Sequence, residues 1–194
     1  MKILFVGTSI TKAAHDARIG WKRNCGMAAS REEKDFVHLT MDGVHEFFPE
    51  SIFETLDASE YEKNLGGFDI TEYENERDFE ADIIVVQMMD KNSVEKVTVQ
   101  NFARHYERLV NYLNRRGAMV FCLGSFWENP QGEEIVRNAC TKNGYTYVKI
   151  EDLNLPENKA GEAFGDEFVS DHPSDKGMKA IAERVVESIR ERCL

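Results

Sequence analysis

The chain has 194 residues, of which 42% are hydrophobic and 30% charged, as expected for one globular domain with a substantial core. Its formal net charge of -11 disfavours phosphate backbones and anionic lipid surfaces, so we expect neither nucleic acid nor membranes as partners. No apolar run reaches the length of a membrane span. The four cysteines have no zinc-ligand spacing, which predicts reduced thiols in a cytoplasmic protein without a metal site.

Short apolar runs alternate with longer amphipathic segments, a pattern typical of a parallel sheet covered by helices. Five runs predict strands, at residues 2–6, 51–57, 81–88, 118–123 and 145–150. The segments between them predict helices, and a last helix is expected over 175–192. We therefore expect residues 1–194 to form a single α/β domain with a three-layer, flavodoxin-like doubly wound fold and the strand order 2-1-3-4-5.

The segments between the strands contain further local sequence patterns. Ser30 and Glu33 resemble a capping box ahead of a helical stripe that starts at Phe36. Residues 151–173 are expected to form a long loop. In a doubly wound sheet, ligands bind at the carboxyl ends of the strands where the strand order reverses. The loops after Val6, after Met88 and before the last helix should meet there.

The first of these loops reads Gly7-Thr8-Ser9-Ile10-Thr11. A serine on a tight glycine turn after a strand presents its hydroxyl at the rim of the sheet, with its N–H in the same space. This arrangement supplies a nucleophile and one oxyanion donor. The alternative is a phosphate-binding loop of a flavodoxin-like binding protein.

A second candidate, His172, directly precedes the closing helix and is followed by Pro173. A histidine fixed there lies at the same sheet edge as Ser9, where it can accept the serine proton and deliver it to the leaving group. The alternative is a surface histidine near a helix cap. Of the other histidines, His15 lies in the first loop and is expected at the rim of the pocket.

Several stretches in a fixed order resemble the SGNH (GDSL-like) hydrolase superfamily, and one bacterial branch of it in particular. The matching stretches are Gly7–Thr11, Ile19–Trp21, Gly26–Ser30, Glu33–His38, Ser125–Trp127 and His172–Met178. The resemblance implies a serine esterase or acylhydrolase without a cofactor. Its substrate would be a small-molecule or carbohydrate ester, often one carrying acetyl or another small acyl group.

The resemblance also implies roles for individual residues. Ser9 matches the nucleophile and His172 the general base, while the N–H groups of Ser9 and Gly26 match two donors of the oxyanion hole. Trp21 and Trp127 are expected to contact the substrate, with packing in the core as the alternative for Trp21.

Two departures from the family pattern concern the oxyanion hole and the acid. The family usually has Gly-x-Asn after the third strand, where this chain reads Gln87–Asn92 without the glycine. Lys91 takes the place of the asparagine in ungapped register, and Asn92 does so with a shift of one residue. The loss of one oxyanion donor costs roughly 10²–10³ in rate.

The usual Asp-x-x-His pattern is also missing, because Val169 stands three residues before His172. Asp171 is the candidate acid, although its side chain is expected to point away from the neighbouring imidazole. The alternative is a backbone carbonyl that orients the ring in a Ser–His dyad. A further interpretation is that the protein has the scaffold of this superfamily but binds an acylated or glycan ligand without efficient catalysis. The sequence does not indicate the oligomeric state.

Overall fold

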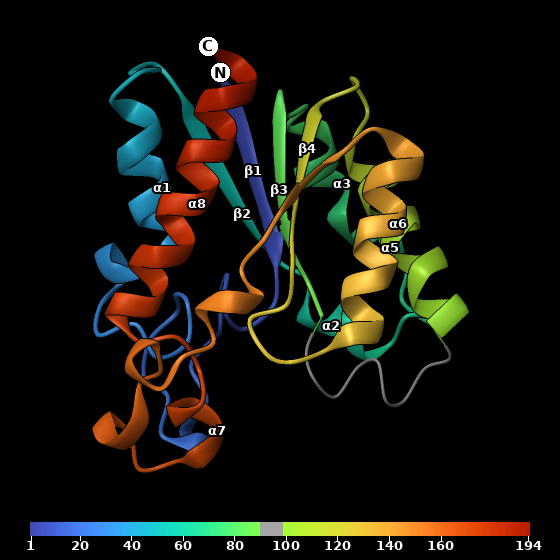
Figure 1. Cartoon of the computed structure of the whole chain (residues 1–194). Coiled ribbons are helices and arrows are strands. Elements are labelled where there is room, and N and C mark those ends of the chain that lie inside the picture. The colour runs from blue at the N-terminus through green and yellow to red at the C-terminus, as the bar shows by residue number, and fades with distance from the viewer. Residues whose placement is uncertain (90–98) are drawn as a thin grey trace.

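The computed structural model describes residues 1–89 and 99–194. Its centre is a five-stranded sheet of the order β2-β1-β3-β4-β5, in which every neighbouring pair is parallel (Figure 1). The strands are β1 (Lys2–Gly7), β2 (Ile52–Asp57), β3 (Ile83–Gln87), β4 (Met119–Leu123) and β5 (Thr146–Val148). The predicted fold class and strand order are therefore confirmed.

Helices cover both faces of this sheet (Figure 1). On one face lie α1 (Phe36–His45) and α8 (Asp175–Cys193), and on the other lie α3 (Glu74–Asp78), α5 (Val99–Leu113) and α6 (Pro130–Asn143). Two short helices, α2 (Ser59–Lys63) and α7 (Glu167–Ser170), lie at the carboxyl ends of the strands. Single 3₁₀ turns occupy Ala17–Ile19, Glu32–Lys34, Ile70–Tyr73, Glu151–Leu153, Pro156–Asn158 and Gly161–Ala163.

The core consists of two apolar layers separated by the sheet. In β1, Ile3 and Phe5 belong to the layer under α1 and α8, whereas Leu4 and Val6 belong to the layer under α5 and α6. All four side chains are buried, because a parallel sheet with helices on both faces leaves neither face to solvent. This explains why the strands appear in the sequence as continuous apolar runs.

The beginning of α1 differs from the sequence prediction. Asp35, not Ser30, caps the helix, since its Oδ1 accepts from the His38 amide at 2.8 Å. The amide and hydroxyl of Ser30 instead donate to the Asp175 carboxylate at the start of α8, at 2.7 and 2.6 Å. Ser30 thus connects the loop before α1 to the start of α8. The sequence pattern of a capping box does not show which partner the serine side chain takes.

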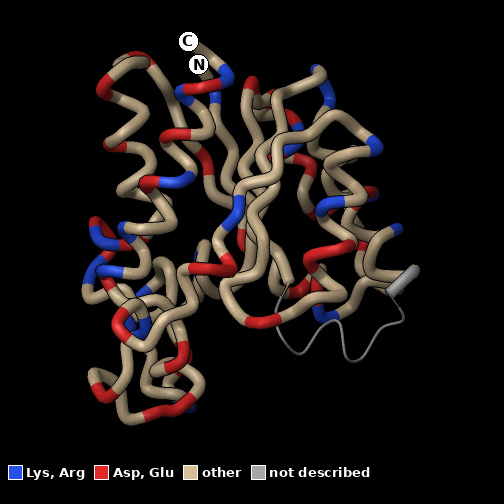
Figure 2. Tube along the Cα trace, viewed as in Figure 1, with Lys and Arg blue, Asp and Glu red and all other residues tan. Residues whose placement is uncertain are grey.

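Charged residues are spread over the outer surfaces of the helices and over the loops at the carboxyl ends of the strands (Figure 2). Both termini lie at the opposite, amino-terminal end of β1 (Figure 1). In the described part of the chain, no helix combines the length and hydropathy needed to cross a membrane.

Candidate active site

The turn after β1 places Ser9 at the rim of the sheet. The Thr11 amide donates to the Thr8 carbonyl oxygen at 2.8 Å and closes the turn. A Cβ on Gly7 would overlap the Thr11 hydroxyl and the Gln87 carbonyl oxygen, so the turn requires glycine at its first position. The chain consequently turns sharply after β1, and Ser9 borders a cavity at the carboxyl end of the sheet.

Ser9 and His172, which are 163 residues apart in the sequence, lie side by side. The Ser9 Oγ is 2.8 Å from the His172 Nε2, and the Nδ1 of the same ring is 2.7 Å from the Phe168 carbonyl oxygen. A carbonyl oxygen only accepts hydrogen bonds, so this contact assigns the proton to Nδ1. Nε2 then carries the lone pair, and the Ser9 hydroxyl donates to it. This is the arrangement of a nucleophile and its general base.

The segment that carries His172 is held by its own backbone. Asp166 caps α7 by accepting from the Phe168 and Val169 amides at 2.9 and 3.2 Å. The His172 amide donates to the Val169 carbonyl oxygen at 3.1 Å, and the Ala160 amide donates to the His172 carbonyl oxygen at 2.9 Å. His172 as a whole is 1% exposed. His172 is thus held by main-chain hydrogen bonds at both its amide and its carbonyl group.

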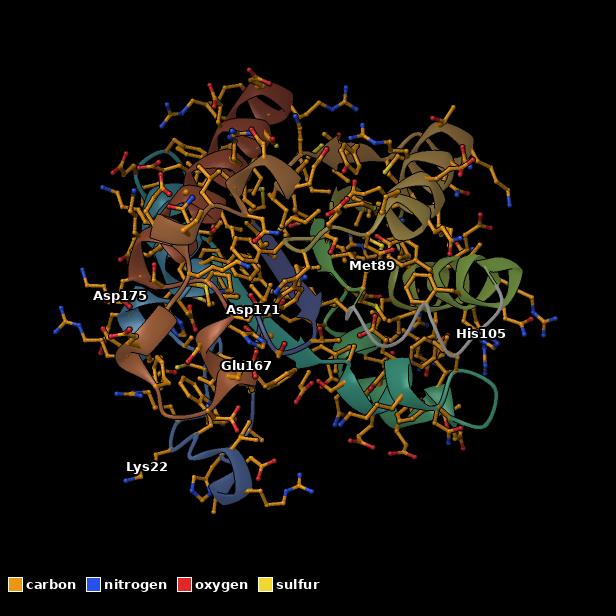
Figure 3. The ribbon with its side chains drawn as sticks, turned by 60° about the horizontal axis from the view of Figure 1, so that its bottom comes forward. Lys22, Met89, His105, Glu167, Asp171 and Asp175 are labelled. Carbon is orange, nitrogen blue, oxygen red and sulfur yellow. The ribbon has the colours of Figure 1, made fainter. Side chains whose placement is uncertain are left out.

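The prediction of Asp171 as the orienting acid needs correction. The Asp171 carboxylate forms an ion pair with Lys159 at 2.6 Å, and its side chain is 40% exposed. The geometry supports the alternative, in which the Phe168 carbonyl orients the ring. In Figure 3, which looks onto the carboxyl end of the sheet, Asp171 and Met89 lie on opposite sides of the end of β1.

The predicted role of Gly26 as an oxyanion donor also needs correction. Its amide donates to the buried Asp35 carboxylate at 3.0 Å and does not face the space beside Ser9. A Cβ on Gly26 would lie 2.5 Å from the Ile10 carbonyl oxygen. The glycine therefore allows close approach of two loops, which the next residue secures, because the Met27 amide donates to the Ser9 carbonyl oxygen at 2.8 Å.

Asp35 connects this loop to α1. Its Oδ1 is 2.8 Å from the His38 Nδ1, while its Oδ2 accepts from the Gly26 amide. The hydrogen bond to Asp35 raises the pKa of His38 above the ordinary histidine value. A titratable pair therefore lies directly behind the loop that supports Ser9.

Among the described residues, the Ser9 amide has no hydrogen-bond acceptor. Its part in an oxyanion hole stays a prediction. The other predicted donor, Asn92 or Lys91, lies outside the described residues. The chain is anchored where it leaves β3, because the buried Glu62 carboxylate accepts from the Met89 amide at 2.7 Å. Met89 has a φ of 107°, in the left-handed region.

The cavity beside Ser9 has a volume of about 540 Å³ and two chemically different walls. One wall is largely apolar and comes from the loop after β1, with Phe168 from α7. The other is polar and comes from the end of β2 and from α2. The apolar wall includes Ala13, Ala14, Ala17, Ile19, Met27 and Phe168, and the polar wall includes Asp57, Ser59, Glu60, Glu62 and Lys63. His15 lines the cavity too, as predicted.

Charges around the cavity are partly paired. Asp16 and Arg18 lie 2.6 Å apart, and hydrogen bonds from Arg18 lower the pKa of Asp16 to about 2. Lys63 and Glu60 form a second pair at 2.9 Å. These pairs are exposed and contribute little to stability, but they reduce the net field that a substrate meets.

Neither tryptophan borders the cavity, so the prediction that they contact substrate needs correction. Trp21 is fully buried, and its Nε1 donates to the Ala13 carbonyl oxygen at 3.0 Å. It supports the apolar wall from behind. Trp127 is 8% exposed and packs against His172, with its Nε1 donating to the Asp171 carbonyl oxygen at 3.2 Å.

Phe168 is the residue at this candidate site that the sequence prediction missed. Its carbonyl oxygen is the hydrogen-bond partner of the His172 Nδ1, its ring packs against the imidazole, and it lines the cavity. Two features of the sequence indicate this contact. Asp166 can cap a helix, and Phe168 and His172 are four residues apart, a spacing that one helical turn brings close together. Residues 151–173 were expected to form a long loop, so this helical turn was not predicted.

Comparison with known proteins gives a result for the fold only. No family model and no curated protein sequence matches the chain. Solved structures do match over most of its length. A lipolytic protein of the G-D-S-L family from Desulfitobacterium hafniense DCB-2 has a TM-score of 0.57 and 10% identity over 96% of this chain and 98% of that one.

Two esterase structures extend this likeness. A two-domain esterase (CEX) active on acetylated mannans has a TM-score of 0.66 and 14% identity over 99% of this chain, which spans 50% of that chain. The acetyl xylan esterase AlAXEase has a TM-score of 0.59 and 16% identity over 97% of this chain and all of that one. The chain has the GDSL/SGNH hydrolase fold. At these identities, the GDSL-type likeness establishes the arrangement of the elements and leaves the chemistry to the site itself.

Proposed function

We propose that the protein is a serine esterase that hydrolyses small acyl esters of the acetyl type, with carbohydrate esters as the leading substrate class. The observation that carries this proposal is the contact of 2.8 Å between the Ser9 Oγ and the His172 Nε2 at the edge of a cavity. The GDSL-type fold supports it, because several solved structures with that fold are named as esterases.

The proposed reaction has two steps. In the first, the Ser9 oxygen attacks the ester carbonyl carbon while its proton moves to the His172 Nε2, and the resulting imidazolium then gives this proton to the departing alcohol oxygen. In the second, His172 takes a proton from water, the water oxygen attacks the acyl carbon, and the carboxylic acid leaves as the proton returns to Ser9. Each proton is thus relayed through one nitrogen.

The negative charge on the carbonyl oxygen needs hydrogen-bond donors. The Ser9 amide is the donor that this proposal uses from the described residues, and Asn92 or Lys91 remains the proposed second donor. Gly26 is not counted, since Asp35 accepts its hydrogen bond.

The size and polarity of the cavity fit a small acyl group on a polar alcohol. A volume of about 540 Å³ accommodates a small molecule or a short segment of a carbohydrate. We assign the acyl group to the apolar wall, which is rich in alanine, and the alcohol to the polar wall at α2. The mannan and xylan esterases named above make acetylated carbohydrate the first substrate to test.

A second candidate function is binding of an acylated or glycan ligand without efficient turnover. The engaged amide of Gly26 favours it, because one expected oxyanion donor is missing and such a loss costs roughly 10²–10³ in rate. The phosphate-binding alternative is less well supported, since the Ser9 hydroxyl faces a buried histidine.

The test compares turnover of nitrophenyl acetate and of acetylated oligosaccharides by the wild-type protein, Ser9→Ala and Ser30→Ala. Ser30 is an exposed serine that contacts Asp175 and does not border the cavity. The proposal predicts that Ser9→Ala abolishes turnover and Ser30→Ala retains it. Turnover by Ser9→Ala at the wild-type rate would refute the proposal. Ligand binding without turnover in the wild-type protein would favour the second candidate.

A further inference from the structure

Two aromatic rings pack against the imidazole of His172. The Trp127 ring centroid lies 4.9 Å from it at an interplanar angle of 79°, and the Phe168 ring centroid lies 4.8 Å from it at 68°. Both are edge-to-face contacts, the favoured geometry for aromatic pairs. The terminal torsion of a histidine has broad minima and does not by itself fix the ring. The orientation of this imidazole therefore depends on its surroundings.

Hydrogen bonds hold Trp127 and the loop that carries it. It follows β4 in a short loop, in which the Gly124 amide donates to the Val148 carbonyl oxygen at 2.9 Å and the Ser125 amide to the Glu133 carboxylate. Its indole N–H then spans to the Asp171 carbonyl oxygen at 3.2 Å, which is the main-chain group directly before His172. The indole is thus tied both to the sheet and to the segment that carries the base.

We propose that Trp127 is a positioning residue for His172, which keeps Nδ1 on the Phe168 carbonyl and Nε2 on the Ser9 hydroxyl. This inference rests on the function proposed above, because it assigns His172 the role of general base. Trp127 does not border the cavity, whereas Phe168 does. Loss of the indole should therefore lower kcat with little change in KM. Loss of the Phe168 ring should affect both.

The chain contains a matched control. Trp21 is also buried, and its Nε1 also donates to a backbone carbonyl, that of Ala13 at 3.0 Å. It is not among the rings that contact His172. Trp21→Phe therefore reproduces the loss of a buried indole hydrogen bond without touching the base.

The experiment measures the tautomer of His172 by proton–nitrogen NMR correlation of the imidazole, with the signals assigned through His172→Asn. We expect the Nδ1–H tautomer in the wild-type protein and in Trp21→Phe. We expect a mixture of tautomers in Trp127→Leu and a smaller effect in Trp127→Phe. In the ester assay, Trp127→Leu should lose about 10- to 100-fold in kcat, the range in which misplaced catalytic groups fall.

The NMR measurement tests the positioning of His172 independently of the proposed function, because the imidazole signal requires no turnover. A tautomer that depends on Trp127 in a protein without esterase activity would support the positioning and refute the function. Wild-type imidazole signals in both Trp127→Phe and Trp127→Leu would refute the positioning, even if the enzyme is active. If Trp127→Leu does not fold, Trp127→Phe decides: a shift toward a mixture of tautomers would support the positioning, and wild-type imidazole signals would refute it.

Discussion

The imidazole of His172 faces a main-chain carbonyl at Nδ1, and this contact has chemical consequences at the scale of single residues. A carbonyl fixes the tautomer and the direction of the ring as an aspartate does, but it stabilises the imidazolium less because it carries no full charge. The site should consequently be sensitive to the position of the ring and insensitive to the nearest carboxylate.

This difference is testable at Asp171. Because its ion pair with Lys159 is partly exposed, Asp171→Asn should lower kcat/KM by less than about fivefold, the equivalent of about 1 kcal/mol. His172→Asn should lower it by roughly 10²–10⁴, the usual contribution of a general base. Steady-state kinetics of the two variants provide the comparison. Losses of equal size would mean that Asp171 supports the base after all.

A second prediction concerns His38. Its pKa is raised in the folded protein by Asp35, so its contribution to stability is full below the unfolded pKa of about 6.5 and is lost as the pH rises through the folded value. His38→Gln should therefore destabilise the protein more at acidic than at alkaline pH, as measured by urea unfolding at both.

The control for His38 uses its partner. In an Asp35→Asn background the carboxylate that contributes most to the raised pKa of His38 is gone, so the pH dependence of the His38→Gln effect should shrink. A smaller part should remain, because Glu32, 3.4 Å from the His38 Nε2, and Glu33 also raise this pKa. The same pH dependence in both backgrounds would show that Asp35 is not its cause.

At the scale of elements, the strands could be predicted from the sequence and the site loops only in part. Burial on both faces gives each strand an apolar run that is visible without tertiary information. Ser9 and His172 could be placed together because strand ends and the last helix define one edge of the sheet. The amide of Gly26 could not be placed, since it is oriented by Asp35. The Asp171 carboxylate was expected to point away from the imidazole, but its partner Lys159 could not be predicted, because the fold of the loop brings the two together.

Gly26 provides a prediction at this scale. Gly26→Ala places a methyl group 2.5 Å from the Ile10 carbonyl oxygen and 2.9 Å from the Asp35 Cβ, and backbone cannot yield easily. We expect a loss of about 1–3 kcal/mol in the free energy of unfolding, together with lower activity because Met27 holds Ser9 from this loop. Gly66→Ala, where no heavy atom lies within 4 Å, should be close to neutral. Equal urea midpoints for both variants would contradict the close approach.

At the scale of the whole molecule, the two apolar layers and the site are separated along the strands. The layers lie above and below the sheet, while Ser9, His172 and the cavity lie at its carboxyl end, opposite the termini (Figure 1). A doubly wound sheet places loops from distant parts of the sequence at this end. The fold therefore explains where a site forms, and the loop contacts determine which chemistry it supports.

The most direct test of the central claim is to treat the protein with a fluorophosphonate and map the adduct by peptide mass spectrometry. The oxygen of an activated serine bonds to phosphorus as the phosphorus–fluorine bond breaks, fluoride leaves and the hydroxyl proton passes to the base. We therefore predict a single adduct on Ser9 that forms far more slowly in His172→Asn. An adduct on another residue, or equal labelling of Ser9→Ala and the wild-type protein, would contradict the assignment of Ser9 as the nucleophile.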